Sequence, residues 1–140
     1  MGHTARVTAA DPHCPCGWAE PYSECCGCYH GGQVWAETAE RLMRSRFSAF
    51  AVGDAAYLLR TWHPSTRPAV LRLDPHQQWT GLTIVATGGG GWLDQEGSVE
   101  FRAHYRLHGR PGHMDENSTF VREAGRWFYL TAGPRRRPSS

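Results

Sequence analysis

Several features that would place the chain in a large functional class are missing from its sequence. No apolar run approaches the ~20 residues of a transmembrane helix, so we expect no membrane span. The first residues contain no apolar core of the kind found in secretory signals, which favours a cytoplasmic location. A net charge of only +2 does not favour a nucleic-acid partner.

Motifs of common enzyme classes are missing as well. The sequence holds no G-x-S-x-G nucleophile signature and no phosphate-binding P-loop. The glycine run at residues 88–91 lacks the residues of a phosphate cradle and is better explained as a turn between strands. No enzyme class is therefore indicated, and a role without catalysis is favoured.

Cysteine, in contrast, is concentrated in one short stretch. All five cysteines lie within residues 14–28. The first two are one residue apart, eight residues follow, and the next two are adjacent. A structural zinc ion takes four thiolate or imidazole ligands in a tetrahedron and leaves no position open for water. The sequence predicts one structural zinc ion, with the ligands Cys14, Cys16, Cys25 and Cys26.

Two alternatives to this ligand set stay open. Cys28 or His30 could replace Cys26 in the zinc shell, since both follow closely in the sequence. Disulfides are the other alternative, because several cysteines in a short chain can form a secreted framework. They are disfavoured here, because the cysteines crowd one end and a bridge between neighbouring Cys25 and Cys26 would be strained.

The cysteine region resembles the SEC-C motif, the small zinc module at the C-terminus of the SecA translocation ATPase. The resemblance rests on residues 14–17 (Cys-Pro-Cys-Gly), Tyr22 and residues 25–27 (Cys-Cys-Gly). The lysines of the motif are absent here, where Ala19 and Glu20 stand near their place. The resemblance implies a zinc module over residues 13–31.

The remaining chain predicts an α+β domain with helices first and an antiparallel sheet after them. Apolar residues recur at helical spacing over 35–51, with three arginines largely off that stripe, and Gly53 is a stop signal. Asp54 can cap a second helix through about residue 61. Strands are expected at 79–87, 98–107, 117–123 and 126–130. Turns are expected at 88–91, 109–112 and 124–125. This order places the helices on one face of the sheet.

Two segments resemble the YchJ-like family of small bacterial proteins. They are residues 42–50 (Leu-Met-Arg-Ser-Arg-Phe-Ser-Ala-Phe) and residues 57–65 (Tyr-Leu-Leu-Arg-Thr-Trp-His-Pro-Ser). The resemblance runs from about Cys14 to Gly133 and includes the SEC-C module. It implies a nuclear transport factor 2-like cone, which can pair through its outer sheet face, and it implies no established activity. The expected domains are a loose leader (1–12), the zinc module (13–31), the cone (32–133) and a basic tail (134–140).

A pocket inside such a cone is the expected place for a ligand or a reaction. His63, at the end of the second helix, could shuttle a proton near neutral pH, and Glu116 is a second candidate base. The alternative is structural, because helix-terminal histidines often bond the last carbonyls and tryptophans usually fill cores. The residues expected to line the pocket are Trp62, His63, Trp79, Tyr105, Glu116, Ser118 and Trp127.

Two functions from different classes follow. The first is a zinc-bearing adaptor or small-ligand-binding module, in which the zinc module docks a protein partner. Its exposed contact surface would be formed by Trp18, Tyr22 and Tyr29, since aromatic residues are favoured at interfaces. The second is an isomerase, dehydratase or hydrolase with His63 or Glu116 as general base. We favour the first, because the cysteine pattern is specific and no catalytic set is.

Overall fold

The computed structural model describes residues 13–17, 20–32 and 34–134 of the chain. The expected leader and all of the basic tail beyond Pro134 lie outside this part. The helical elements are η1 (Tyr22–Glu24), α2 (Cys26–His30), α3 (Ala39–Val52) and α4 (Ala55–Arg60). The strands are β1 (Gln77–Gly89), β2 (Glu96–Leu107), β3 (Arg110–Glu123) and β4 (Arg126–Pro134). The predicted order of helices before strands is confirmed.

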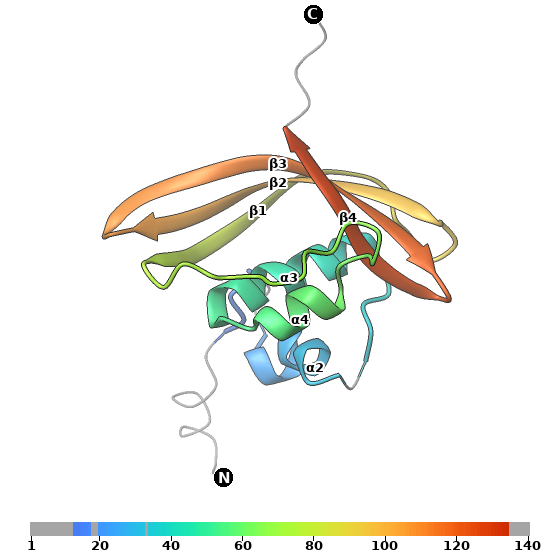
Figure 1. Ribbon diagram of the computed structural model, residues 1–140, viewed down its shortest axis with the longest axis horizontal. Helices are drawn as coiled ribbons and strands as arrows, with labels where there is room; N and C mark the ends of the chain where they lie inside the picture. Colours follow the sequence, from blue (N-terminus) through green and yellow to red (C-terminus); the bar gives the residue numbers. More distant parts are fainter. Residues whose placement is uncertain (1–12, 18–19, 33, 135–140) are drawn as a thin grey trace, which may run out of the picture.

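The four strands form one antiparallel sheet in the order β1-β2-β3-β4. Register shifts interrupt β1 at Trp79/Gly81 and at Ile84/Ala86, and the β3–β4 pairing at Thr119/Phe120. Such bulges bend a strand and increase its twist. Figure 1 shows the result, a sheet that arches over α3, with α2 on the side of α3 that faces away from the sheet. This is the cone that the family resemblance implies.

Helix α3 begins at a cap rather than at the first apolar residue. The helix was expected to start at residue 35, but Thr38 is the N-cap and its side chain accepts a hydrogen bond from the backbone N–H of Arg41. The side chain of Trp35 is used elsewhere, since its indole N–H donates to the carbonyl of Trp127 over 2.8 Å. Gly53 ends α3 in the left-handed conformation, and Asp54 caps α4, both as predicted.

The turn between β2 and β3 lies earlier than expected. It is a two-residue turn at His108 and Gly109, both with positive φ, as a tight hairpin requires. The predicted turn of 109–112 is wrong because Pro111 and Gly112 are paired in β3, opposite Arg106 and Tyr105. A Cβ at position 112 would lie 2.9 Å from the Tyr105 ring, so glycine lets that ring lie over the strand. The hairpin at residues 124–125 is confirmed.

Helix α3 is the element that joins the parts of the molecule. It packs on β1, β2 and β4 on one side and on α2 on the other. Its buried apolar residues meet the inner face of the sheet, including Phe101, Phe120 and Trp127. Each such side chain contributes roughly 1.5–3 kcal/mol by leaving water. In the described part of the chain, the helices are too short and too polar to cross a membrane.

Candidate metal centre and internal cavity

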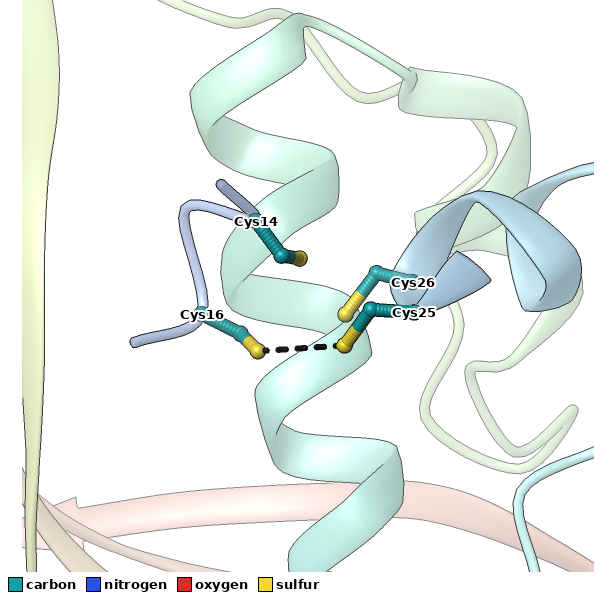
Figure 2. A group of neighbouring side chains, drawn as sticks. All are labelled: Cys14, Cys16, Cys25 and Cys26. Atoms are coloured by element: carbon teal, nitrogen blue, oxygen red, sulfur yellow. Dashed lines mark hydrogen bonds between the residues drawn. The ribbon is translucent and has the colours of Figure 1, made fainter. Parts of the chain in front are cut away.

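The four cysteines of the predicted zinc shell lie together. Their sulfur atoms are all within 4.8 Å of one another, and all four residues are buried. Figure 2 shows the first pair entering from the loop before η1 and the second pair from the N-terminal end of α2. All four are free thiols rather than disulfides.

The spacing of the sulfurs fits a tetrahedral metal site. The Sγ atoms of Cys16 and Cys25 are 3.7 Å apart. Zinc–sulfur bonds of about 2.3 Å place two ligands of a tetrahedron ~3.8 Å apart. Four thiolates also match the donor set of structural zinc sites, and they leave no position for water or substrate. The cluster is therefore compatible with a metal ion in a closed, structural site.

The backbone around the cluster is held by short-range contacts. The N–H of Cys14 donates to the carbonyl of Glu20 over 2.8 Å, which closes the loop that carries the first pair. Gly17, with φ +99°, supplies the turn inside that loop. Gly27 allows α2 to approach Tyr22, since a Cβ there would lie 2.7 Å from the Tyr22 carbonyl oxygen. Sequence-local features thus bring the two cysteine pairs together.

The thiols perturb one another electrostatically. Hydrogen bonds with Cys16 and Cys26 lower the pKa of Cys14 well below its usual range. Burial raises the pKa of Cys25 to about 12, and the hydrogen bond with Cys14 raises that of Cys26. Neighbouring thiolates repel one another, so complete ionisation of the cluster requires a compensating cation.

Cys28 and His30 lie away from the cluster. The thiol of Cys28 donates to the Ser23 carbonyl over 3.2 Å. His30 uses both ring nitrogens, because Nε2 is 2.8 Å from the Ser45 carbonyl oxygen and Nδ1 contacts the Tyr22 hydroxyl. A carbonyl can only accept, so Nε2 carries the proton and Nδ1 accepts from the phenol. In the described chain His30 therefore fastens α2 to α3.

The aromatic contact surface expected on the zinc module is not available as predicted. Tyr29 is only 5% exposed, and its hydroxyl donates to Glu37 while accepting from Arg41. Tyr22 is half-buried, and Trp18 lies outside the described residues. Tyr29 is buried because the module packs onto α3 instead of standing free.

A cavity of about 200 Å³ is lined by residues of α3 and of all four strands of the sheet. Its walls are mostly aromatic and aliphatic, with a few polar groups among them. The lining residues from the helices and the following loop are Met43, Arg46, Phe47, Phe50 and Trp62. Those from the sheet are Trp79, Phe101, Ala103, Met114, Glu116, Ser118 and Tyr129.

The sequence-predicted pocket residues divide into two groups. Those that line the cavity are Trp62, Trp79, Glu116 and Ser118. Tyr105 packs against Trp79, with ring centroids 5.3 Å apart, but it is not among the lining residues. Trp127 is buried in the core, where its indole N–H donates to the carbonyl of Glu37.

His63 and Glu116 do not share a site. The ring of His63 bonds Ser65 over 2.7 Å and Glu123 over 2.9 Å, and His63 is not among the cavity residues. Glu116 lines the cavity, where burial raises the pKa of its carboxyl. Within the described chain Glu116 forms no ion pair with an arginine. The structure therefore gives the two candidate bases separate surroundings.

The polar residue that sequence reasoning missed is Arg46. It was placed off the apolar stripe, yet it is 3% exposed and lines the cavity. Its Nη1 donates to the Leu58 carbonyl over 2.8 Å and to the Thr61 hydroxyl over 2.7 Å. Burial lowers the pKa of the guanidinium to about 10. Helical spacing could have found it, because position 46 is three residues after Met43 and four before Phe50, both of which line the cavity.

These features define a class, a nuclear transport factor 2-like cone that carries a SEC-C-type cysteine module. A family model described as "YchJ, middle NTF2-like domain" matches residues 38–132. A UPF0225 protein of Streptomyces coelicolor is 55% identical over 118 residues, which cover 84% of this chain and 92% of that protein. A UPF0225 protein of Corynebacterium efficiens is 50% identical over 119 residues, covering 85% and 91%. The chain belongs to the YchJ-like (UPF0225) family.

Two solved structures are similar over most of the chain. The solution structure of RPA3114, a SEC-C motif containing protein from Rhodopseudomonas palustris, is 28% identical with a TM-score of 0.76. It covers 87% of this chain and 98% of its own. The crystal structure of a SEC-C motif containing protein from Psychrobacter arcticus is 26% identical with a TM-score of 0.71, covering 92% and 85%. Both agree with the cone and the cysteine module described above.

Proposed function

We propose that the protein binds a small ligand inside the cone, and that one structural zinc ion in its cysteine cluster holds α3 in place. The observation that carries the ligand-binding role is the cavity of about 200 Å³ between α3 and the sheet. An apolar cavity of about 150 Å³ in another protein holds benzene. A single ring with a short side chain is therefore of suitable size here.

The contacts of the cysteine module support a structural role for zinc. The Sγ atom of Cys14 is 3.3 Å from the Ser48 hydroxyl, and Arg44 donates to the Cys16 carbonyl over 2.8 Å. Both partners belong to α3, and so does Ser45, which His30 contacts. Because the cysteine module is bound along α3 in this way, it is better suited to support the cone than to present a free docking surface. Reduced thiols also favour a cytoplasmic location.

The cavity supports binding more than catalysis. Glu116 is the one carboxyl group among its lining residues, and His63 does not line it. Ser118 lines it too, but no described residue forms a hydrogen bond that would link its hydroxyl to a base. An activated nucleophile needs such a base within hydrogen-bond reach. The polar groups of the cavity are therefore better explained by ligand binding than by catalysis.

The ligand-binding role can be tested by filling the cavity. Ala103 lines the cavity and is buried, whereas Ala86 is exposed on β1 outside it. A library of small fragments should be screened by saturation-transfer NMR against the zinc-loaded wild type, Ala103→Leu and the matched control Ala86→Leu. Fragments that bind the wild type and Ala86→Leu but not Ala103→Leu support the proposal. Fragments that bind all three proteins equally, or no binding at all, would contradict it.

A further inference from the structure

A buried positive charge lines the cavity without forming an ion pair among the described residues. In the described part of the chain, no carboxylate lies within ion-pair distance of Arg46. Its two hydrogen bonds both leave from Nη1 and end on neutral oxygens. The guanidinium lies over the rings of Trp62 and Tyr129, 5.2 and 4.4 Å from their centroids. The remaining donors of this group have no described partner.

Trp62 provides a second donor beside Arg46. Its indole nitrogen is fully buried, and it has no hydrogen-bond acceptor among the described residues. Buried donors are almost always paired in folded proteins, so an unpaired one indicates a missing acceptor. Two neighbouring donors, one of them charged, are a suitable pair for an oxygen anion.

The remaining walls restrict what can carry that anion. Phe47, Phe50, Phe101 and Trp79 present rings to the same space, which favours an apolar ligand body. The carboxyl group of Glu116 also lines the cavity. It would repel any negative charge on the ligand beyond the one that Arg46 neutralises. A cationic ligand would face the charge of Arg46 in a buried setting. A ligand with one negative charge and an apolar body therefore fits these lining residues best.

We propose that the cavity takes a small monocarboxylate with an apolar body, its carboxylate held by Arg46 and by the indole N–H of Trp62. This inference rests on the ligand-binding function proposed above and adds the chemical class of the ligand. The aromatic rings of α3 and the sheet enclose the apolar body.

Three probes of nearly equal size separate charge from shape. Phenylacetate, phenylacetamide and phenethylamine differ mainly at the polar end, which is negative, neutral or positive. Binding to the zinc-loaded full chain should be measured by calorimetry. Phenylacetate should bind about tenfold or more tighter than phenylacetamide, because its hydrogen bond with Arg46 is charge-assisted on both sides. Phenethylamine should bind more weakly than either.

Two tryptophans of the cavity give a matched pair of variants. Trp62→Phe removes the unpaired indole N–H, whereas Trp79→Phe makes the same substitution at another lining position, on β1. Trp62→Phe should weaken phenylacetate binding several-fold, and Trp79→Phe should weaken all probes alike. Arg46→Met should abolish the preference for phenylacetate over phenylacetamide. Circular dichroism and zinc content establish that each variant is folded, and Trp62→Phe keeps the test decisive if Arg46→Met does not fold.

The outcomes separate this inference from the function on which it rests. Equal affinity for phenylacetate and phenylacetamide, or tighter binding of phenethylamine, would overturn the carboxylate class and leave a ligand-binding cavity. The carboxylate class also fails, and the ligand-binding cavity remains, if only fragments of other chemistry bind. If no probe and no fragment binds the cavity, both proposals fail together.

Discussion

The thiol of Cys14 lies 3.3 Å from the hydroxyl of Ser48, so the cysteine cluster touches the middle of α3. The residues just before Ser48 in the helix, Arg46 and Phe47, line the cavity. One helix therefore contacts the cluster on one side and the cavity on the other. A change in the cluster can reach the cavity through a displacement of α3 alone, without a contact between the two sites.

The first prediction concerns the metal. Protein purified without chelator should contain one zinc ion per chain, and only Cys28 should react readily with a thiol reagent. The other four thiols are buried and should become reactive when zinc is removed. Elemental analysis and thiol titration with and without chelator measure both quantities. Two or more fast thiols in the zinc-loaded protein would contradict a closed four-cysteine site.

Serine variants provide the matched control for the ligand set. Cys26→Ser should lose zinc and lower the melting temperature, because a structural zinc ion contributes folding free energy. Cys28→Ser should keep zinc and stability, because the Cys28 thiol lies outside the four-cysteine cluster and donates to the Ser23 carbonyl. If Cys28→Ser released the metal and Cys26→Ser did not, the ligand set would have to be redrawn.

The second prediction tests whether His30 is a brace or a ligand. His30→Ala removes the hydrogen bonds with the Ser45 carbonyl and with the Tyr22 hydroxyl, although the Ser45 carbonyl keeps its donor within α3. The free energy of unfolding should fall by about 1–3 kcal/mol, as measured in urea. The zinc content should stay at one ion per chain. Loss of zinc in this variant would show that His30 coordinates it.

Local patterns were enough to predict the fold class, because the relevant signals lie within a few residues. Gly53 and Asp54 stop one helix and cap the next, and Ala124-Gly125 forms a hairpin turn. One error arose where a side chain is used at long range. Trp35 was predicted to begin a helix, but its indole N–H donates to the carbonyl of Trp127, far along the chain.

The same distinction applies to the candidate sites. The cysteine pairs are close in sequence, so their assembly could be predicted, whereas binding of zinc itself stays a prediction. The surroundings of His63 depend on Glu123, which is 60 residues away, and no local pattern indicates that contact. Arg46 is different, because its place on the apolar face follows from helical spacing. It was nevertheless predicted to lie largely off the apolar stripe.

The third prediction concerns Gly27 in α2. A Cβ at this position would lie 2.7 Å from the Tyr22 carbonyl oxygen, which is backbone and cannot rotate away. Gly27→Ala should therefore destabilise the protein by about 1–3 kcal/mol, despite the better helix propensity of alanine. Gly133→Ala is the control, because a Cβ there meets no atom within 4 Å. Thermal unfolding of the two variants gives the comparison, and equal melting temperatures would contradict the close approach.

The last prediction uses the raised pKa of Glu116. Burial disfavours its ionised form, so the folded protein binds this proton more tightly than the unfolded chain does. The contribution of Glu116 to stability is therefore greatest at low pH. It declines as the pH rises from the ordinary value of 4.5 through the higher pKa of the folded state. Glu116→Gln should remove this decline and should unfold at a higher urea concentration than the wild type at pH 7, with a smaller difference at pH 4. A wild type that is more resistant than the variant at pH 7 would mean that the charged carboxylate has a stabilising partner.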